Sequence, residues 1–114
     1  MTTVFIVEDE PLISLNMEAV LRKAGFEIAA CAGSLEQALV FLETGDCDVG
    51  VLDANLRGES VERIATVLEQ RGRPFLLVSG YGRLQLPSQF HHTSFLPKPF
   101  KPQDLVRAVR EISA

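Results

Sequence analysis

The stretch VGVLDANLRG (residues 49–58) decides the expected fold. Its apolar run over residues 49–52 predicts a buried strand, which stops at the carboxylate of Asp53 and a polar segment containing Gly58. Asp53 is therefore expected at the carboxyl end of a strand, the edge where open α/β sheets bind ligands. An Asp in this position often only caps a turn. The rest of the chain has to distinguish a functional carboxylate from a structural one.

Strands and helices are expected to alternate on both sides of this stretch. Similar short apolar runs predict strands over residues 4–7, 26–31, 74–78 and 95–97. Helices are expected from Pro11 to Gly25, from Ser34 to Gly45, from near Ser60 to Gly72, and from Pro102 onward. Strands that are apolar throughout, separated by helices, are typical of a parallel sheet covered on both faces.

Apolar stripes and local signals support these helices. The residues expected to face the sheet are Ile13, Met17, Val20, Leu21 and Ala24; Leu35, Ala38, Leu39 and Leu42; Val61, Ile64, Ala65 and Leu68; and Leu105, Ala108, Val109 and Ile112. Pro11 suits a first helical turn. Ser34 and Gln37 form a capping box, and Gly45 supplies a stop.

The segment from Tyr81 to Thr93 interrupts this alternation. A fourth helix is expected there, but Gly and Pro residues break the helical pattern, so the segment should be short, irregular or mobile. His91 and His92 lie within it. Adjacent histidines cannot both face one metal ion from a regular helix, so they are expected to be surface or partly packed residues.

Length and charge exclude several classes of function. The 114 residues fit a single domain, residues 1–114, whose output would pass through its own surface. Eleven basic and fifteen acidic residues give a net charge of -4 without a basic run, so nucleic acid is not an expected partner. No cationic leader or long apolar segment is present, which predicts a cytoplasmic protein without a membrane partner. Cys31 and Cys47 lack zinc-site spacing and should be core or loop residues.

Acidic residues follow the first strand as well as the third. If these strands are neighbours, Glu8, Asp9 and Asp53 meet at one edge. Two like charges about 4 Å apart repel by ~4 kcal/mol at an effective dielectric near 20, so the cluster is unfavourable unless protons or a cation offset it. A divalent ion is the simplest answer. Hard oxygen ligands favour Mg²⁺ or Mn²⁺. Glu10 is left outside this site because it can simply be a solvated residue of the rim.

A hydroxyl and an ammonium group are expected at the same edge. Ser79 follows the fourth strand, and Lys98 follows the fifth. Carboxylates, a metal, a hydroxyl and a lysine form a phosphoryl-transfer site, in which the metal and the lysine neutralise phosphoryl oxygens and one carboxylate attacks phosphorus to give an acyl phosphate.

Four motifs in order carry a resemblance to a known family. They are Val7-Glu8-Asp9-Glu10, Leu52-Asp53 with Asn55, Val78-Ser79-Gly80, and Leu96-Pro97-Lys98-Pro99-Phe100. Over its whole length the chain resembles response-regulator receiver domains of two-component systems. The resemblance implies a flavodoxin-like, doubly wound five-stranded parallel sheet of order 2-1-3-4-5, here with helix 4 short or disordered. It also implies a cis Lys98-Pro99 peptide bond.

The resemblance further implies a role for each site residue. Asp53 would accept a phosphoryl group from a phosphohistidine on a sensor histidine kinase or a histidine phosphotransfer protein. The implied Mg²⁺ ligands are Glu8, Asp9, Asp53 and the backbone carbonyl of Asn55, with Mn²⁺ as a substitute, while Lys98 and Ser79 would contact the phosphoryl group.

In the implied switch, Ser79 moves toward the phosphorylated Asp53 and Phe95 turns inward to change a protein-interaction surface. Asn55 and Tyr81 would flank the attacking water and set the dephosphorylation rate, and Gly80 would leave the acyl phosphate accessible.

Two departures from the family pattern stand out. Arg57 occupies a place where many receivers carry proline, so the loop after Asp53 is expected to have a different shape. The weak fourth helix resembles a subset of stand-alone receivers in which this region is irregular.

The leading interpretation is a stand-alone response regulator, which relays phosphate or presents a phosphorylation-dependent surface and is not a turnover enzyme. One alternative is a Mg-dependent phosphohydrolase with an Asp nucleophile, which would want that nucleophile after the first strand and a cap over its substrate. Another is a flavodoxin-like cofactor-binding module, but Glu8 and Asp9 would repel a flavin phosphate.

Overall fold

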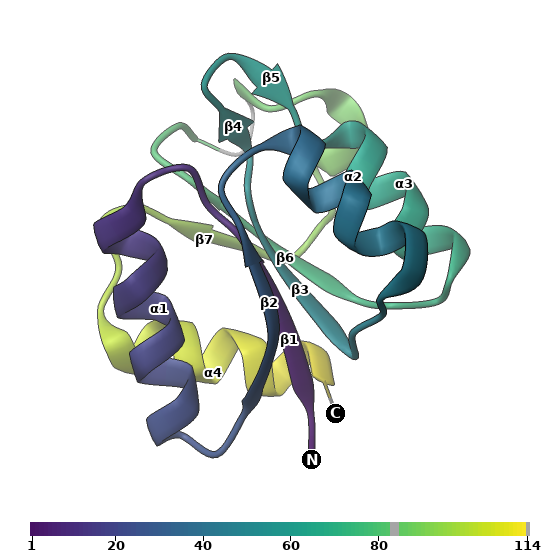
Figure 1. Cartoon of the computed structure of the whole chain (residues 1–114). Helices are drawn as coiled ribbons and strands as arrows, with labels where there is room; N and C mark the ends of the chain where they lie inside the picture. The colour runs from purple at the N-terminus through teal and green to yellow at the C-terminus, as the bar shows by residue number, and fades with distance from the viewer. Residues whose placement is uncertain (83–84, 114) are drawn as a thin grey trace.

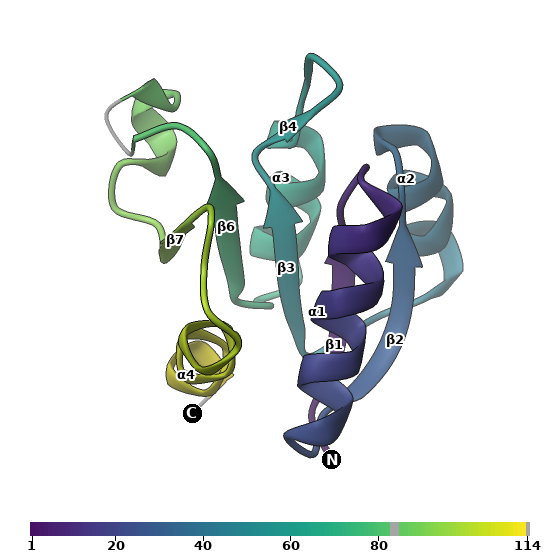
Figure 2. The same ribbon diagram turned by 90° about the vertical axis from the view of Figure 1, so that its left-hand side faces the viewer.

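Five parallel strands form the central sheet of the computed structural model, which describes residues 1–82 and 85–113. Its order is β2-β1-β3-β6-β7, so the expected order 2-1-3-4-5 is confirmed (Figures 1 and 2). The strands are β1 (Thr3–Val7), β2 (Glu27–Ala32), β3 (Val49–Asp53), β6 (Phe75–Ser79) and β7 (Phe95–Pro97). All five were expected to within two residues of these bounds.

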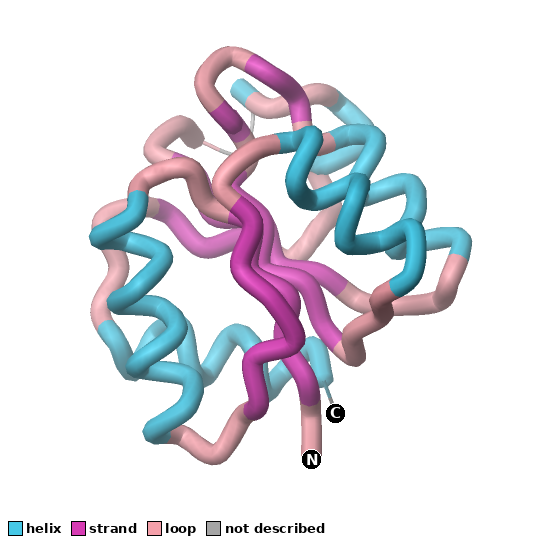
Figure 3. The backbone as a smooth tube through the Cα atoms, viewed as in Figure 1, coloured by secondary structure: helices cyan, strands magenta, loops and turns pink. Residues whose placement is uncertain are grey.

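Helices cover both faces of this sheet (Figures 1 and 3). On one face lie α1 (Pro11–Lys23) and α4 (Pro102–Ser113), and on the other lie α2 (Leu35–Thr44) and α3 (Glu62–Gln70). In the described part of the chain, every helix is too short or too polar to cross a membrane.

The alternation of side chains along each strand divides the core into two layers. In β1, Phe5 and Val7 pack on the side of α2 and α3, whereas Val4 and Ile6 pack on the side of α1 and α4. The expected helix stripes supply the other half of each layer. Their most buried members are Met17, Leu21, Ala38, Leu42, Val61, Ile64, Ala65, Leu68, Leu105 and Val109.

The helix ends follow the expected signals with two differences. Pro11 opens α1, and Ser34 Oγ accepts a hydrogen bond of 3.1 Å from the Gln37 N–H. Gln37 reaches back to the N–H of Gly33 rather than to that of Ser34. Gly45 ends α2 with a φ of -105°, which is not left-handed. A Cβ at Gly45 would lie 2.5 Å from the Phe41 ring, so a larger residue here would require that ring to shift.

A small hairpin after β3 was not expected. β4 (Asn55–Leu56) and β5 (Glu59–Ser60) pair antiparallel and project beyond the carboxyl edge of the sheet (Figure 1). Because β5 occupies residues 59–60, α3 begins at Glu62, two residues after the expected start near Ser60. Two-residue strands are too short for their side-chain pattern to reveal them in the sequence.

The segment between β6 and β7 contains a short 3-10 helix, η2 (Ser88–Phe90), in place of a long α-helix. The expectation of a short, irregular segment is confirmed for its described residues. Leu86 and Phe90 are buried against the layer that contains α2 and α3. His91 Nε2 lies 2.9 Å from the Leu86 carbonyl oxygen and His92 is exposed, as expected.

The two ends of the described chain lie together at the amino edge of the sheet (Figure 1). Met1 and Thr2 line the same surface depression as Ile112 and Ser113, next to the start of β3. The opposite, carboxyl edge carries the residues singled out in the sequence.

Candidate functional site

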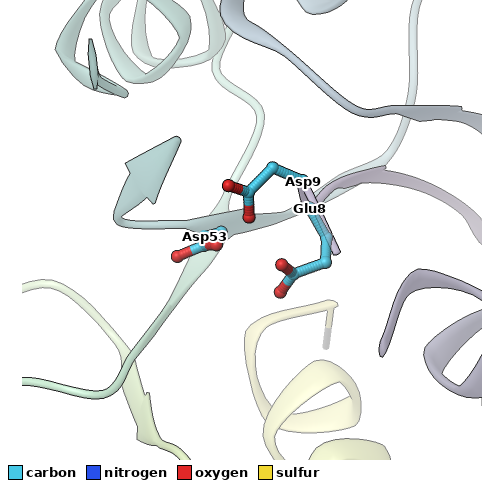
Figure 4. Close-up of side chains that lie close together, drawn as sticks. All are labelled: Glu8, Asp9 and Asp53. Carbon is cyan, nitrogen blue, oxygen red and sulfur yellow. The ribbon is translucent and has the colours of Figure 1, made fainter. Parts of the chain in front are cut away.

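Three carboxylates meet at the carboxyl edge of the sheet. Because β1 and β3 are paired neighbours, with Val7 opposite Leu52, the residues that follow them come together. Glu8, Asp9 and Asp53 each offer an oxygen, and these oxygens lie within 4.8 Å of one another (Figure 4). Glu8 is 2% exposed and Asp53 is 6% exposed. Such close burial of like charges is unfavourable without a compensating cation.

Lys98 supplies one compensating charge. It directly follows β7, and its backbone N–H donates to the Ser79 carbonyl at 2.8 Å. Its Nζ lies 2.9 Å from Glu8 Oε1 and 3.5 Å from Asp53 Oδ2. Burial alone would lower the pKa of Lys98, but these carboxylates outweigh it and raise the pKa above its usual value. Lys98 is therefore a stable cation inside the site. The Lys98-Pro99 peptide bond is cis, as expected.

The surroundings of Asp53 raise its pKa and so favour its protonated form. Burial is the main cause that raises its pKa to about 7, and the charge of Glu8 adds to the rise. The Asn55 N–H opposes it by donating a 3.1 Å hydrogen bond to Asp53 Oδ1. A cation close to the carboxylate would favour the ionised form that a nucleophile requires.

Asp9 is the least buried of the three carboxylates and contacts an arginine that the sequence did not mark as a site residue. Arg57 Nε lies 3.7 Å from Asp9 Oδ2. Burial tends to raise the pKa of Asp9, but contacts with Glu8 and Asp53 and the charge of Arg57 outweigh it, so the pKa lies below its usual value. The one signal in the sequence that links Arg57 to the site is its position four residues after Asp53.

The other expected residues surround this cluster. Ser79 ends β6, is 2% exposed, and accepts a 2.9 Å hydrogen bond from the Tyr81 N–H. The Tyr81 side chain is 55% exposed. Asn55 is exposed, and its Oδ1 accepts a hydrogen bond from the Gly58 N–H at 2.7 Å. Phe95 is partly buried at the start of β7 and packs on the layer containing α2 and α3.

The donor set fits a small divalent cation. All three clustered side chains offer hard oxygen atoms, which Mg²⁺ and Mn²⁺ prefer. Glu8 Oε1 is fully buried and pairs with Lys98 Nζ at 2.9 Å. One ammonium group offsets only part of the negative charge of three clustered carboxylates. These residues can therefore hold a cation that also offsets their mutual repulsion.

The fold is a doubly wound α/β sheet with a carboxylate cluster at its carboxyl edge, and comparison with known proteins gives the family. Residues 4–110 match the response regulator receiver domain, so the chain belongs to that family and to two-component signalling.

Among curated proteins, the chain is 27% identical to the transcriptional regulatory protein PdtaR of Mycobacterium tuberculosis, with 97% of this chain and 60% of that protein covered. It is 30% identical to the transcriptional regulatory protein TdiR of Thauera aromatica, with 95% of this chain and 49% of that protein covered. The chain thus spans about half to three fifths of the curated relatives that it matches.

Solved structures show the same architecture over nearly the whole chain. SdrG from Sphingomonas melonis Fr1 is 31% identical with a TM-score of 0.86, covering 100% of this chain and 98% of that chain. The receiver domain of the Erythrobacter litoralis response regulator PhyR is 30% identical with a TM-score of 0.83, covering 98% and 88%.

Proposed function

We propose that this receiver domain is a phosphorylation switch in which Asp53 accepts a phosphoryl group from a phosphohistidine. The donor would be a sensor histidine kinase or a histidine phosphotransfer protein. The observation that supports this most is the meeting of Glu8, Asp9 and Asp53 with Lys98 in contact with two of them.

In the proposed transfer, an oxygen of ionised Asp53 bonds to phosphorus while the phosphorus–nitrogen bond of the donor histidine breaks. The electron pair of that bond stays on the imidazole, which then takes up a proton. The Asn55 N–H holds Asp53 Oδ1, and Lys98 provides positive charge beside Oδ2 and the incoming phosphoryl oxygens. Mg²⁺ held by Glu8, Asp9, Asp53 and the Asn55 carbonyl would neutralise further charge on the phosphoryl group.

Ser79 and Phe95 are the proposed link from chemistry to surface. Both lie on paired strands, and Leu77 of β6 stands opposite Phe95 of β7. A hydrogen bond from the Ser79 hydroxyl to the phosphoryl group would draw Ser79 toward Asp53, and Phe95 would turn into the space that this movement opens. Asn55 and Tyr81 are proposed to set the rate of hydrolysis, because both are exposed and each lies two residues after a buried residue of the site, Asp53 and Ser79.

The domain is proposed to be a switch and not a turnover enzyme. An Asp-based phosphohydrolase would be expected to carry its nucleophile after the first strand, whereas Asp53 ends β3. Repeated turnover of a phosphate ester such as p-nitrophenyl phosphate would favour that alternative.

Phosphorylation with a small acyl phosphate tests the assignment. With acetyl phosphate and Mg²⁺, intact-protein mass spectrometry should show one added phosphoryl group, and the signal should disappear with EDTA. Asp53→Asn should abolish labelling, whereas Asp48→Asn, an exposed carboxylate at the opposite edge, should not. Undiminished labelling of the Asp53→Asn protein would refute the role of Asp53.

A further inference from the structure

Arg57 is held in an unusual backbone conformation beside the carboxylates. Arg57 and Gly58 form the two-residue loop between β4 and β5, with φ values of 52° and 87°. Positive φ at both positions is the type I′ arrangement, which favours Asn and Gly and disfavours a long side chain at the first position. Arg57 is the one non-glycine residue with positive φ in the described chain. Such outliers cluster at functional sites.

The side chain of Arg57 reaches back from this loop to the metal-binding candidates. Its Nε lies 3.7 Å from Asp9 Oδ2, and Asp9 belongs to the cluster whose oxygens lie within 4.8 Å of one another. The Arg57 side chain is 77% exposed and that of Asp9 is 15% exposed. A guanidinium does not lose its proton in proteins, so this loop carries a permanent cation at the open side of the cluster.

We propose that Arg57 is a built-in competitor for the divalent cation, and that it weakens the binding of Mg²⁺ to this domain. The inference rests on the proposed function, since it assumes that Asp9 is a metal ligand. An arginine and a divalent ion repel each other, and both are attracted to the same carboxylate. Binding of the ion therefore weakens the attraction between Arg57 and Asp9, and the exposure of Arg57 at a hairpin tip allows its side chain to move into solvent.

The effect should be modest because the ion pair is long and largely exposed. Pairs of this kind change equilibria by about two- to fivefold. Glu8 and Lys98 make a shorter contact of 2.9 Å deeper in the site, and that contact does not involve the loop. The contribution of Arg57 can thus be changed without disturbing the buried charges.

Calorimetric titration of the full domain with MgCl₂ at low ionic strength tests the proposal. Arg57→Gln should bind Mg²⁺ about two- to fivefold more tightly than the wild type. Arg57→Lys keeps the charge and should stay near the wild type. The matched control is Arg73→Gln, which removes an arginine paired with Asp46 at the opposite edge and should leave Mg²⁺ affinity unchanged. The gain in Arg57→Gln should shrink as salt is added.

Arg57→Asn is a second charge-removing variant that should keep the fold of the hairpin, because Asn-Gly is the favoured sequence for this turn. It should bind Mg²⁺ at least as tightly as Arg57→Gln. Equal affinity in the wild type, Arg57→Gln and Arg57→Asn would overturn the inference while leaving the metal site intact. Equal shifts in Arg57→Lys and Arg57→Gln would overturn it in favour of loop shape. Absence of Mg²⁺ binding in every variant would instead contradict the proposed metal-dependent function.

Discussion

At the scale of single residues, Asp53 faces two opposing demands. It has to be ionised to attack phosphorus, yet its burial and the charge of Glu8 raise its pKa to about 7. Lys98 lies 3.5 Å from it and offsets only part of this cost. A cation bound at this site would therefore strongly favour the ionised form of the Asp53 carboxyl group.

The raised pKa predicts a dependence of stability on pH in EDTA. The folded domain holds the Asp53 proton up to about pH 7, whereas the unfolded chain releases it near 3.8. The contribution of this proton to the stability of the folded domain is complete below the pKa of the unfolded chain. It is lost as pH rises through the pKa of the folded domain. The unfolding temperature of the wild type should therefore fall between about pH 4 and pH 7.

Asp53→Asn should remove this contribution and be about 1–3 kcal/mol more stable than the wild type at pH 8 without metal. Parallel pH–stability curves for the two proteins would contradict a raised Asp53 pKa.

Most of the candidate cluster could be located from the sequence because it depends only on where the strands end. Glu8, Asp9, Asp53 and Lys98 each follow an apolar run, and parallel strands place those ends at one edge. Arg57 could not be placed in this way. Its contact with Asp9 depends on the sign of φ in a two-residue loop, and Arg-Gly is not a strong signal for that turn.

At the scale of secondary-structure elements, the carboxyl end of α2 depends on an arginine from a distant segment. The last turn of α2 has no basic residue. Arg71, the C-cap of α3, donates from Nη1 to the Gly45 carbonyl at 2.8 Å and from Nη2 to the Leu42 carbonyl. These bonds satisfy carbonyl groups that the helix itself leaves without partners, and they join α2 to α3.

Arg71→Met should therefore destabilise the domain by about 1–2 kcal/mol, because charge-assisted hydrogen bonds to two carbonyls are lost. Arg63→Met, an exposed position on α3, should change stability by less than about 0.5 kcal/mol. Urea unfolding followed by circular dichroism measures both. Similar midpoints for the two variants would show that the Arg71 contacts contribute little.

The irregular segment between β6 and β7 is anchored by its apolar residues, which its broken helical pattern did not reveal. Phe90 is 2% exposed within the layer that contains α2 and α3. Phe90→Ala should lower the free energy of unfolding by about 3–5 kcal/mol. Gln89→Ala, at an exposed neighbouring position, should lower it by less than about 0.5 kcal/mol. Equilibrium unfolding in urea distinguishes them. Little loss in Phe90→Ala would mean that the segment is only loosely docked.

The elements themselves follow from patterns of different strength. Long apolar stripes and runs identify α1 to α4 and the sheet strands because burial on a fixed face repeats along them. The β4–β5 hairpin and η2 have two or three residues per element, so no period exists to detect. Gly45 likewise indicates a helix stop in the sequence, but only the packed structure shows that a side chain there would meet the Phe41 ring.

At the scale of the whole molecule, the protein has a net charge of -4, and three of its carboxylates lie together at one edge of the sheet. A cation bound at this edge is expected to stabilise the folded domain. A ligand that binds only the folded state adds stability according to its concentration relative to its dissociation constant. Mg²⁺ at about 100 times that constant should thus add about 2.7 kcal/mol, seen as a higher unfolding temperature by calorimetry.

The same addition should have a much smaller effect on Asp9→Asn, and NaCl at equal ionic strength should not reproduce it. An equal rise in the wild type and Asp9→Asn would place the stabilising ion elsewhere on the molecule.

The location of Met1, Thr2, Ile112 and Ser113 around one depression at the amino edge has a practical consequence. A tag or fusion partner attached near Met1 or Ser113 would project from the edge of the sheet opposite to Asp53. The domain could then be immobilised on a sensor surface, or joined to a fluorescent protein, with its carboxylates still open to an approaching phosphodonor. Labelled in this way, it could report on partner encounter and on cation binding without obstruction of the edge where both would occur.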